Sequence, residues 1–503
     1  MRVKPTNMQE ESSNNNIGGS FLYSFFVTVI SGVVTVAYPL AIGLLFGAET
    51  MGDFSVLFYW STFLSIPIAN GIAPAIARFI AANKKTDHVQ YQTIGTKMSL
   101  LYVLIISIVF PLLSFLVFDL TVVEFFLVLP LIILTITHFL IRYTLQGQEK
   151  FKDLLKLEII AFSVFLPFMV VFSILPHVLN WSGLSAFYFL LIPIIAYHLT
   201  IDLIYFIPRI KKVYFKEFFK FPEITKKILL YALFIGIGSL FSLGTSQIQV
   251  VISDLYVSEF EVGVLSFWNS AVTPINIITV ALGGILLPRV TNLRKIDRQL
   301  SQKLVNSFNW SFSMIIIPII GLVFLLFSKY PVFLDIITFN KYNMVYYWII
   351  VILLVFRAVI YLINSPTIAF YASFEKKVMI SPIASFVFSL TAVLAWIFLV
   401  PLIDVFGFAV GIALGGVLSF ITVQVFALIN TKGKIGYHFI FGILFFGLNA
   451  LGIYLLEVIN YIWILVVWSI ISIPIIVYGV LILVRILSNK GYSQIVDDVL
   501  IED

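Results

Sequence analysis

Long apolar segments alternate with short polar ones along almost the whole chain. Each apolar segment holds about 20 residues or more, enough to cross the roughly 30 Å hydrocarbon core of a bilayer as a helix. Only helices and closed barrels satisfy their backbone hydrogen bonds in lipid, and these segments are too long for barrel strands. The pattern therefore predicts an all-α polytopic membrane protein with fourteen spans, at residues 20–46, 54–81, 98–118, 122–145, 157–176, 184–207, 228–252, 262–287, 305–327, 345–370, 378–400, 405–429, 437–456 and 460–487.

One loop divides the predicted spans into six and eight. Residues 208–227 contain seven basic residues with Phe and Tyr between them, which is typical of an amphipathic segment at the membrane interface. We therefore expect two bundles of six helices around a central cleft, followed by two additional helices. The expected parts are a cytoplasmic lead (1–19), the first bundle (20–207), the linker (208–227), the second bundle (228–429), the additional helices (437–487) and a cytoplasmic tail (488–503).

The two bundles carry traces of an internal repeat. A shift of 211 positions superposes Gly52 on Gly263 and Arg78 on Arg289, so that the second span resembles the eighth. Other shifts relate the fourth and fifth spans to the tenth and eleventh. Because transport sites form between such repeats, we expect the substrate site between the bundles.

The positive charges are distributed unevenly about the predicted spans. All but three of the 31 Lys and Arg lie on one side, whereas the acidic residues show no such bias. The exceptions are Lys329, Lys341 and Arg357. Since an excess of Lys and Arg marks the cytoplasmic side, we expect a multi-pass plasma membrane protein with both termini in the cytoplasm. The net charge of +6 then reflects topology and contact with anionic membrane lipids, not nucleic acid.

The composition and the motifs narrow the class further. With 61% hydrophobic and 11% charged residues, the chain lies outside the range of soluble proteins. It has no cysteine, which excludes disulfides and thiolate chemistry, and it lacks the phosphate-binding loop and HExxH motifs. We therefore expect a transporter and not an enzyme, without metal or cofactor, driven by H⁺, Na⁺ or the membrane potential.

Two of the predicted spans carry matching polar stripes. Polar residues at steps of three and four share one helical face, and polar side chains in a bilayer usually face a cavity or a partner helix. The first and seventh spans are thus expected to line a water-filled cleft, although small hydroxyl residues also let helices pack closely. The stripes are Ser24, Thr28, Ser31, Thr35 and Tyr38 on the first span, and Ser239, Ser242, Ser246, Gln249 and Ser253 on the seventh.

The second and eighth spans both combine proline with polar residues. Asn269 and Asn276 share a face of the eighth span beside Pro274, and the second span contains Pro67 and Pro74. Paired broken helices in corresponding places indicate a transport site or a hinge. The alternative is that membrane helices simply tolerate proline.

Arg357 lies near the middle of the tenth span. An unpaired Arg there costs roughly 2.5 to 3.5 kcal/mol on insertion scales, so its side chain is expected to face the cleft. Its planar guanidinium matches the geometry of a phosphate or pyrophosphate. The alternative is a structural role, in an ion pair with Asp202 or in bonds to nearby carbonyls.

Four other charged or titratable residues are candidates for binding. Arg78 and Arg289 end their spans on the basic side, where topology alone explains them, but they could also bind substrate. His198 and Asp202 are four residues apart on the sixth span and share a face. Such a pair could bind a coupling proton or sodium ion, although Asp202 lies near the predicted inner boundary.

Three stretches carry a family resemblance. They are NNIGGSFLYSFFVTVISGVVTVAYPLAIGLLFGAETMGDFSVLFYW, GIAPAIARFIAANKK and GVLSFWNSAVTPINIITVALGGILLPRVTNL. Through them the chain resembles the polysaccharide transporters, or lipid-linked oligosaccharide flippases, of the multidrug/oligosaccharidyl-lipid/polysaccharide exporter superfamily. The resemblance implies two six-helix bundles around a V-shaped cleft, alternating access, and a polyprenyl (pyro)phosphate substrate that carries an oligosaccharide.

Two departures from related families favour this substrate. The first span has neither the Arg residues that peptidoglycan-precursor flippases bring into the cleft nor the Asp of many multidrug exporters. We therefore expect Arg357 to contact the phosphate, and Asn269, Asn276, Asn364 and Gln249 to bind sugar hydroxyls. Expected partners are the polyprenyl-linked sugar and the glycosyltransferases or glycan polymerase of the same pathway, with the transporter itself a monomer.

Two other functions remain open at the sequence level. An ion-coupled multidrug exporter of the same superfamily would need an acidic cleft, for which Asp202 is the candidate. A membrane-embedded polysaccharide polymerase or ligase would need a sizeable outer loop with catalytic residues. The largest outer loop, residues 328–344, is too short for one.

The topology is testable because the chain has no native thiol. Single cysteines introduced at Ser12 and Ser488 should not react with a membrane-impermeant maleimide in intact cells, and should react once the membrane is permeabilised. Labelling of either position in intact cells would place that terminus outside and contradict the charge argument.

Overall fold

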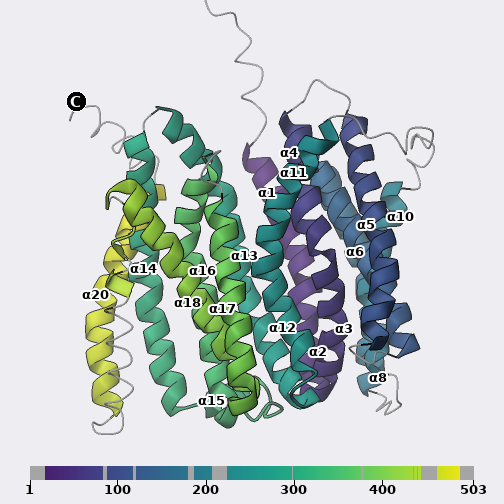
Figure 1. Cartoon of the computed structure of the whole chain (residues 1–503). Helices are drawn as coiled ribbons and strands as arrows, with labels where there is room; N and C mark the ends of the chain where they lie inside the picture. Colours follow the sequence, from purple (N-terminus) through teal and green to yellow (C-terminus); the bar gives the residue numbers. More distant parts are fainter. Residues whose placement is uncertain are drawn as a thin grey trace, which may run out of the picture. The chain divides into compact units, whose positions relative to one another are not determined.

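The computed structural model describes residues 17–82, 88–116, 121–178, 186–206, 224–296, 298–374, 379–433, 435–438, 440–442, 444 and 461–487. These residues form helices and turns, with no β-strand among them (Figure 1). The helices are α1 (Ile17–Gly32), η1 (Val33–Ala37), α2 (Tyr38–Phe46), α3 (Ala48–Ile66), η2 (Pro67–Ile72), α4 (Ala73–Ala82), α5 (His88–Leu116), α6 (Val122–Gly147), α7 (Phe151–Met169), η3 (Val170–Ile174), α8 (Leu175–Val178), α9 (Ala186–Phe189), α10 (Ile192–Phe206), α11 (Ile224–Ser239), η6 (Leu240–Gly244), α12 (Thr245–Ser253), α13 (Glu259–Ile296), α14 (Arg298–Lys329), α15 (Val332–Ile337), α16 (Met344–Ala372), α17 (Ile380–Ile403), α18 (Val405–Thr431) and α20 (Tyr461–Leu487).

The all-α polytopic prediction is confirmed. Within the described residues, 11 helical stretches are long and apolar enough to cross a membrane, and they coincide with eleven of the fourteen predicted spans. The eighth predicted span lies inside the 38-residue helix α13. Most of the thirteenth, most of the linker and all of the C-terminal tail fall outside the described residues.

The sixth predicted span is shorter than expected. A continuous helix over residues 184–207 is wrong, because α9 ends at Phe189 and α10 begins at Ile192. Pro193 explains the start, since proline has no N–H to donate to the preceding turn and is favoured in the first turn of a helix. The Leu190 carbonyl at the break accepts a 2.7 Å hydrogen bond from the Tyr38 hydroxyl, so the interruption leaves this buried acceptor satisfied.

The chain forms two compact units. Unit 1 comprises Met1–Tyr38 and Leu64–Gly236, and unit 2 comprises Pro39–Phe63 and Ile237–Asp503. The boundaries fall inside helices and not in the linker, so that residues 39–63 belong with unit 2. Residues 224–236, the first part of α11, belong with unit 1.

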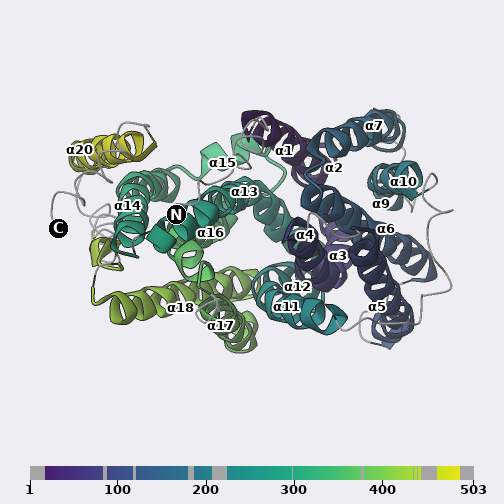
Figure 2. The same cartoon turned by 90° about the horizontal axis from the view of Figure 1, so that it is seen from above.

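In unit 1 the helices pack as neighbours around a small apolar core. α7 packs on α1 and α10, and α6 packs on α4 and α10 (Figures 1 and 2). The crossing of α4 and α6 is close, because a Cβ on Gly147 would meet the backbone of Ala77. A buried cluster joins α4, α5 and α11 through Ala75, Ile76, Ile80, Tyr91, Ile94, Met98, Ile228 and Ala232.

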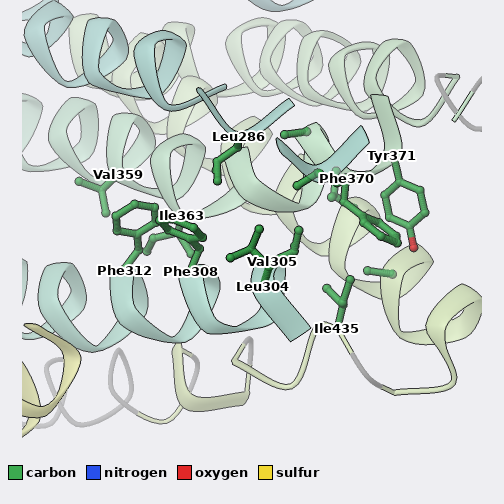
Figure 3. Close-up of a cluster of buried hydrophobic side chains, with 14 of the residues drawn as sticks. Leu286, Leu304, Val305, Phe308, Phe312, Val359, Ile363, Phe370, Tyr371 and Ile435 are labelled. Carbon is green, nitrogen blue, oxygen red and sulfur yellow. The ribbon is translucent and has the colours of Figure 1, made fainter. Parts of the chain in front are cut away.

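In unit 2 the apolar core lies between α13, α14 and α16. Phe308 and Phe312 of α14 pack with Val359 and Ile363 of α16, next to Leu286 of α13 (Figure 3). α20 packs on α14, and α17 packs on α18 (Figure 2). The core thus holds α16, with Arg357 in its middle, against several other helices.

Four apolar helices contain a π-helical turn. η1 interrupts the first span, η6 the seventh and η3 the fifth. η2 begins at Pro67, so the second span is broken where the sequence predicts it. α13, in contrast, runs through Pro274 as one helix, and the predicted pair of broken helices is therefore only half observed. Turns of this kind are frequent at functional sites.

Equivalent positions of the repeat meet inside unit 2. A Cβ on Gly263 of α13 would overlap the Ala48 carbonyl, and a Cβ on Gly52 of α3 would overlap the Glu259 carbonyl. Two turns further on, the Tyr59 hydroxyl lies 3.4 Å from the Ser270 hydroxyl. Gly52 and Gly263, like Tyr59 and Ser270, are separated by the 211 positions of the repeat shift. The two glycines therefore permit the close crossing of the repeated helices α3 and α13.

This crossing predicts a strong effect of a single methyl group. Gly263→Ala should destabilise the protein by about 1 to 3 kcal/mol, as overpacking commonly does, which would appear as a lower melting temperature of the purified protein. Gly238→Ala is the control, since its Cβ would make only ordinary 3.5 Å contacts with Pro382. Equal melting temperatures for the two variants would contradict a close crossing at Gly263.

Candidate functional site

Arg357, in the middle of α16, contacts small, polar and aromatic groups of unit 2. Its Nη2 donates a 2.7 Å hydrogen bond to the Ser246 hydroxyl of α12. Its guanidinium carbon lies 5.3 Å from the ring centre of Phe388 on α17. Its aliphatic stem passes Gly416 of α18, where a Cβ would come within 3.3 Å of it. Four helices thus position this one cation.

The charge of Arg357 is not neutralised by an acidic neighbour. Among the described residues no carboxylate lies within ion-pair distance of it; its contacts are a hydroxyl, an aromatic face and the nearby Tyr361 phenol. The side chain is half-buried, so the charge is only partly solvated, and a buried charge without a partner is costly. A cation–π contact offsets roughly 0.5 to 2 kcal/mol of such a cost. The guanidinium therefore retains unused capacity to bind an anion.

Unit 1 contains an equivalent arginine–serine contact. Arg142 of α6 donates a 3.3 Å hydrogen bond to the Ser31 hydroxyl of α1. The separation of 111 residues is the same as that between Arg357 and Ser246. One shift of 215 positions therefore maps both residues of one contact onto both residues of the other. Each serine lies beside a π-helical turn, Ser31 before η1 and Ser246 after η6.

The two arginines differ in their electrostatic surroundings. Glu158 of α7 lies within electrostatic reach of Arg142, whereas Arg357 has no acidic neighbour among the described residues. Arg142 lies near the end of its predicted span. From the sequence alone it is therefore one of the positive charges assigned to the cytoplasmic side. Only the geometry shows that it is half-buried and bound to the first span. The equal 111-residue spacing is the signal that could have found it.

The amide side chains predicted to bind sugar fall into two groups. Gln249 is buried and its Nε2 has no partner among the described residues, as is also true of the Asn276 Oδ1 atom. Asn269 donates a 3.3 Å hydrogen bond to the Tyr59 hydroxyl. Asn364 instead accepts a 2.7 Å hydrogen bond from Gln424 of α18 and is 3% exposed. Gln249 and Asn276 thus keep free hydrogen-bonding atoms, while Asn364 joins two helices.

The two other predicted arginines are less informative. Arg78 is exposed and stacks over the Tyr231 ring at 4.2 Å, within unit 1. Arg289 belongs to α13, and its side chain lies outside the described residues. No contact described for unit 2 therefore places either arginine next to Arg357.

The hydroxyl stripes of the first and seventh spans are largely satisfied within their own helices. Thr28 and Thr35 each donate to the carbonyl four residues earlier, as Ser242 and Ser246 do. Ser24 and Ser239 are half-buried. Tyr38 is buried between Ser173 and Leu190, and Ser253 is fully buried against Val250. Tyr38 and Ser253, the last residues of the two stripes, therefore serve packing. The earlier half-buried positions remain candidates for a water-filled face.

His198 and Asp202 belong to a larger buried cluster in unit 1. His138 and Glu158, which the sequence analysis did not select, join them from α6 and α7. Glu158 was missed because its position at the start of the fifth predicted span assigned it to a loop. In the structure it is 0% exposed, so Asp202 is not the only acid buried among these helices.

Taken together, the long apolar helices, the π-helical turns and the buried charges define a multi-pass membrane protein built for a transport role. Comparison with known families agrees. Residues 18–294 match the family described as polysaccharide biosynthesis protein. This stretch is more than half of the chain, and the chain therefore belongs to that family. No curated protein matches it in a sequence comparison.

Solved structures with the same fold are membrane transporters. An inward-facing multidrug resistance transporter of the MATE family, in the MOP superfamily, matches with a TM-score of 0.58 and 16% identity, over 82% of this chain and 98% of that chain. The lipid II flippase MurJ, in an inward closed conformation, matches with a TM-score of 0.56 and 14% identity, over 92% and 99%. A MATE structure in a bent conformation gives 0.53 and 16%, over 86% and 96%.

These comparisons confirm the family resemblance that the sequence suggested. At such low identity the structural matches establish the fold, and the family match adds membrane transport in polysaccharide biosynthesis. The solved structures reported above are those of transport proteins.

The middle parts of the polar stripes can be tested by cysteine accessibility. Cysteines at Thr28 and Ser242, which are half-buried on the polar faces, should react with a small water-soluble thiosulfonate. Cysteines at Val29 and Leu240, which are exposed apolar positions on other faces, should stay unreactive in lipid. Equal reactivity of all four positions would contradict a defined aqueous face.

Proposed function

We propose that the protein flips a polyprenyl-(pyro)phosphate-linked oligosaccharide from the cytoplasmic to the outer leaflet of the plasma membrane. The observation that carries this proposal is Arg357, a half-buried cation in the middle of a membrane helix without an acidic partner among the described residues. A permanently charged, planar guanidinium suits a phosphate better than a neutral or cationic ligand. The family, polysaccharide biosynthesis protein, supports a sugar-bearing substrate.

The residues around Arg357 divide the work of binding. Arg357 contacts the phosphate oxygens, and Ser246 holds the guanidinium in place through its 2.7 Å hydrogen bond. Gln249, one turn beyond Ser246, and Asn276 offer unused hydrogen-bonding atoms to sugar hydroxyls. Asn269, which donates to the Tyr59 hydroxyl, lies on the same face of α13 as Asn276 and is a further candidate for contacts with the sugar. The Asn364–Gln424 pair fixes α16 to α18 two turns from Arg357 and positions the site.

Alternating access moves the headgroup while the polyprenyl chain stays in lipid. The two units rock against each other, as repeats do in other transporters, and the π-helical turns of the first and seventh spans provide local flexibility. Outward movement of a negative charge is favoured by about 2.3 kcal/mol per charge per 100 mV of inside-negative potential. The membrane potential therefore contributes to turnover. The glycosyltransferases that make the substrate act on the cytoplasmic side.

A multidrug exporter is the competing function. The fold similarity to MATE transporters is compatible with it, but the buried acids of unit 1 already have hydrogen-bond partners on at least one oxygen. Glu158 contacts His138 and Tyr197, and the Asp202 Oδ2 atom accepts a hydrogen bond from Thr137, while its Oδ1 atom has no partner among the described residues. In unit 2, Arg357 is a half-buried cation without an acidic neighbour among the described residues, which favours an anionic substrate.

The test is headgroup translocation in proteoliposomes. Flipping of a polyprenyl-pyrophosphate-linked oligosaccharide can be followed by the accessibility of its sugar to an added glycosidase. Arg357→Ala should lower the rate at least tenfold, because the phosphate loses its counter-charge. Arg357→Lys should lower it only several-fold, since the charge remains but the bidentate geometry is lost.

Two controls make this result specific. Lys329→Ala removes an exposed cation at the end of α14 in the same unit and should leave the rate unchanged. Size-exclusion profiles of all variants should match that of the parent. A folded Arg357→Ala protein that flips the lipid at the parental rate would show that Arg357 does not bind the headgroup, and export of a cationic drug by the same protein would favour the competing function.

A further inference from the structure

A cluster of titratable side chains is enclosed between α6, α7 and α10 of unit 1. The Nδ1 atoms of His138 and His198 lie 2.7 Å apart. The Nε2 atom of His138 lies 3.2 Å from the Glu158 Oε1 atom, and the Tyr197 hydroxyl donates to Glu158 Oε2. Exposed fractions are 0% for Glu158, 4% for His138, 6% for His198 and 0% for Tyr197.

The distance between the two histidines limits how many protons they hold. At 2.7 Å one Nδ1 must carry a hydrogen and the other must offer a lone pair, so the pair cannot be protonated at both Nδ1 atoms. With Glu158 ionised, the Nε2–H of His138 donates to the carboxylate. His138 Nδ1 then accepts from His198 Nδ1–H, and His198 Nε2 keeps a lone pair. In this geometry the pair takes up one further proton, at His198 Nε2, and no more.

A second carboxylate lies one helical turn from this nitrogen. Asp202 follows His198 by four residues on α10, so the two share a face. Its Oδ2 accepts a hydrogen bond from Thr137, the neighbour of His138 on α6. Its Oδ1 is buried and has no partner among the described residues. A buried carboxylate oxygen without a donor gains a partner when a proton is delivered to it, which makes Asp202 a second position for the same proton.

The net charge of the cluster depends on whether that proton is bound. The attraction between Glu158 and Arg142 compensates the carboxylate when the histidines are neutral. α1 carries no charged residue. The packed helices also carry Glu124 and Tyr143 on α6, Tyr205 on α10, His88, Tyr91, Tyr102 and the buried Lys97 on α5, the exposed Arg78 on α4, and Lys152, Asp153 and Lys156, which are exposed on α7.

We propose that this His138–His198–Glu158 cluster, with Asp202, binds the proton that couples ion movement to transport. Nitrogen atoms in hydrogen-bond contact with each other leave no space for a sodium ion between them, and Na⁺ prefers oxygen ligands as other hard cations do. The bound proton is exchanged with water on either side as the protein alternates. No covalent bond other than N–H or O–H forms or breaks.

The arginine of unit 1 connects the cluster to the first span. Arg142 lies one turn after His138 on α6 and donates to Ser31 on α1, two residues before η1 begins. When the histidine pair is protonated, its positive charge pairs with Glu158, and the attraction of Glu158 for Arg142 is weakened. Protonation thereby changes how strongly Arg142 binds Ser31 of the first span, next to the π-helical turn η1. This inference deepens the proposed function, on which its transport readout rests.

The first experiment measures coupling directly. Proteoliposomes with the membrane potential clamped at zero carry a pH gradient in either direction, and flipping of the lipid-linked oligosaccharide is measured. The parental rate should differ at least threefold between the two gradient directions. His198→Gln and Glu158→Gln should flip at one rate in both, whereas His438→Gln, which alters a buried histidine of unit 2, should keep the difference. A parental rate independent of the gradient, or a His198→Gln protein that keeps the dependence, would overturn the proposal.

A second measurement requires no substrate. The chain has five histidines, and ¹⁵N NMR of the purified protein in lipid nanodiscs reports the tautomer and charge of each. The His138–His198 pair should show one shared Nδ1 proton and should take up one proton, not two, on acidification. Uptake of two protons, or none, would contradict the cluster as a proton site. A protein that passes this measurement but does not flip the lipid would refute the proposed substrate and leave the proton site standing.

Discussion

Lipid cannot hydrogen-bond or solvate, and this constraint shapes the surroundings of many polar groups in the described helices. A backbone carbonyl freed at Leu190 is met by the Tyr38 hydroxyl. Threonines in the spans donate to carbonyls of their own helix. Glu158, fully enclosed, has a histidine and a tyrosine on its two oxygens. Arg357 departs from this pattern, since it keeps a full charge with only a hydroxyl and an aromatic ring beside it.

The internal repeat makes that departure meaningful. The same arginine–serine contact occurs in both units with the same spacing of 111 residues. In unit 1 an acid balances the arginine, and that acid belongs to a cluster able to hold a proton. In unit 2 the acid is missing among the described residues, and the arginine is left for a ligand. On the proposals made above, this repeated contact serves a substrate site in unit 2 and an ion site in unit 1.

The sequence predicts much of the fold because lipid enforces long apolar helices, and eleven of the expected spans are found by length and composition. It fails where local geometry decides. Proline interrupts the helix before Pro193 but not at Pro274, where α13 is continuous, so proline alone does not decide where a span breaks. For the site, Arg357 could be predicted from its isolation in an apolar segment. His138, Glu158 and Arg142 could not, because each owes its role to helices that are distant in the sequence.

The central claim is that Arg357 recognises the phosphate of a lipid carrier, and direct binding tests it without requiring turnover. Affinities of the purified protein for a polyprenyl pyrophosphate and for the uncharged polyprenol of equal length can be compared by native mass spectrometry. The account predicts that the parental protein prefers the pyrophosphate at least tenfold and that Arg357→Gln, which keeps hydrogen-bonding capacity without charge, loses this preference. An undiminished preference in Arg357→Gln would contradict the account.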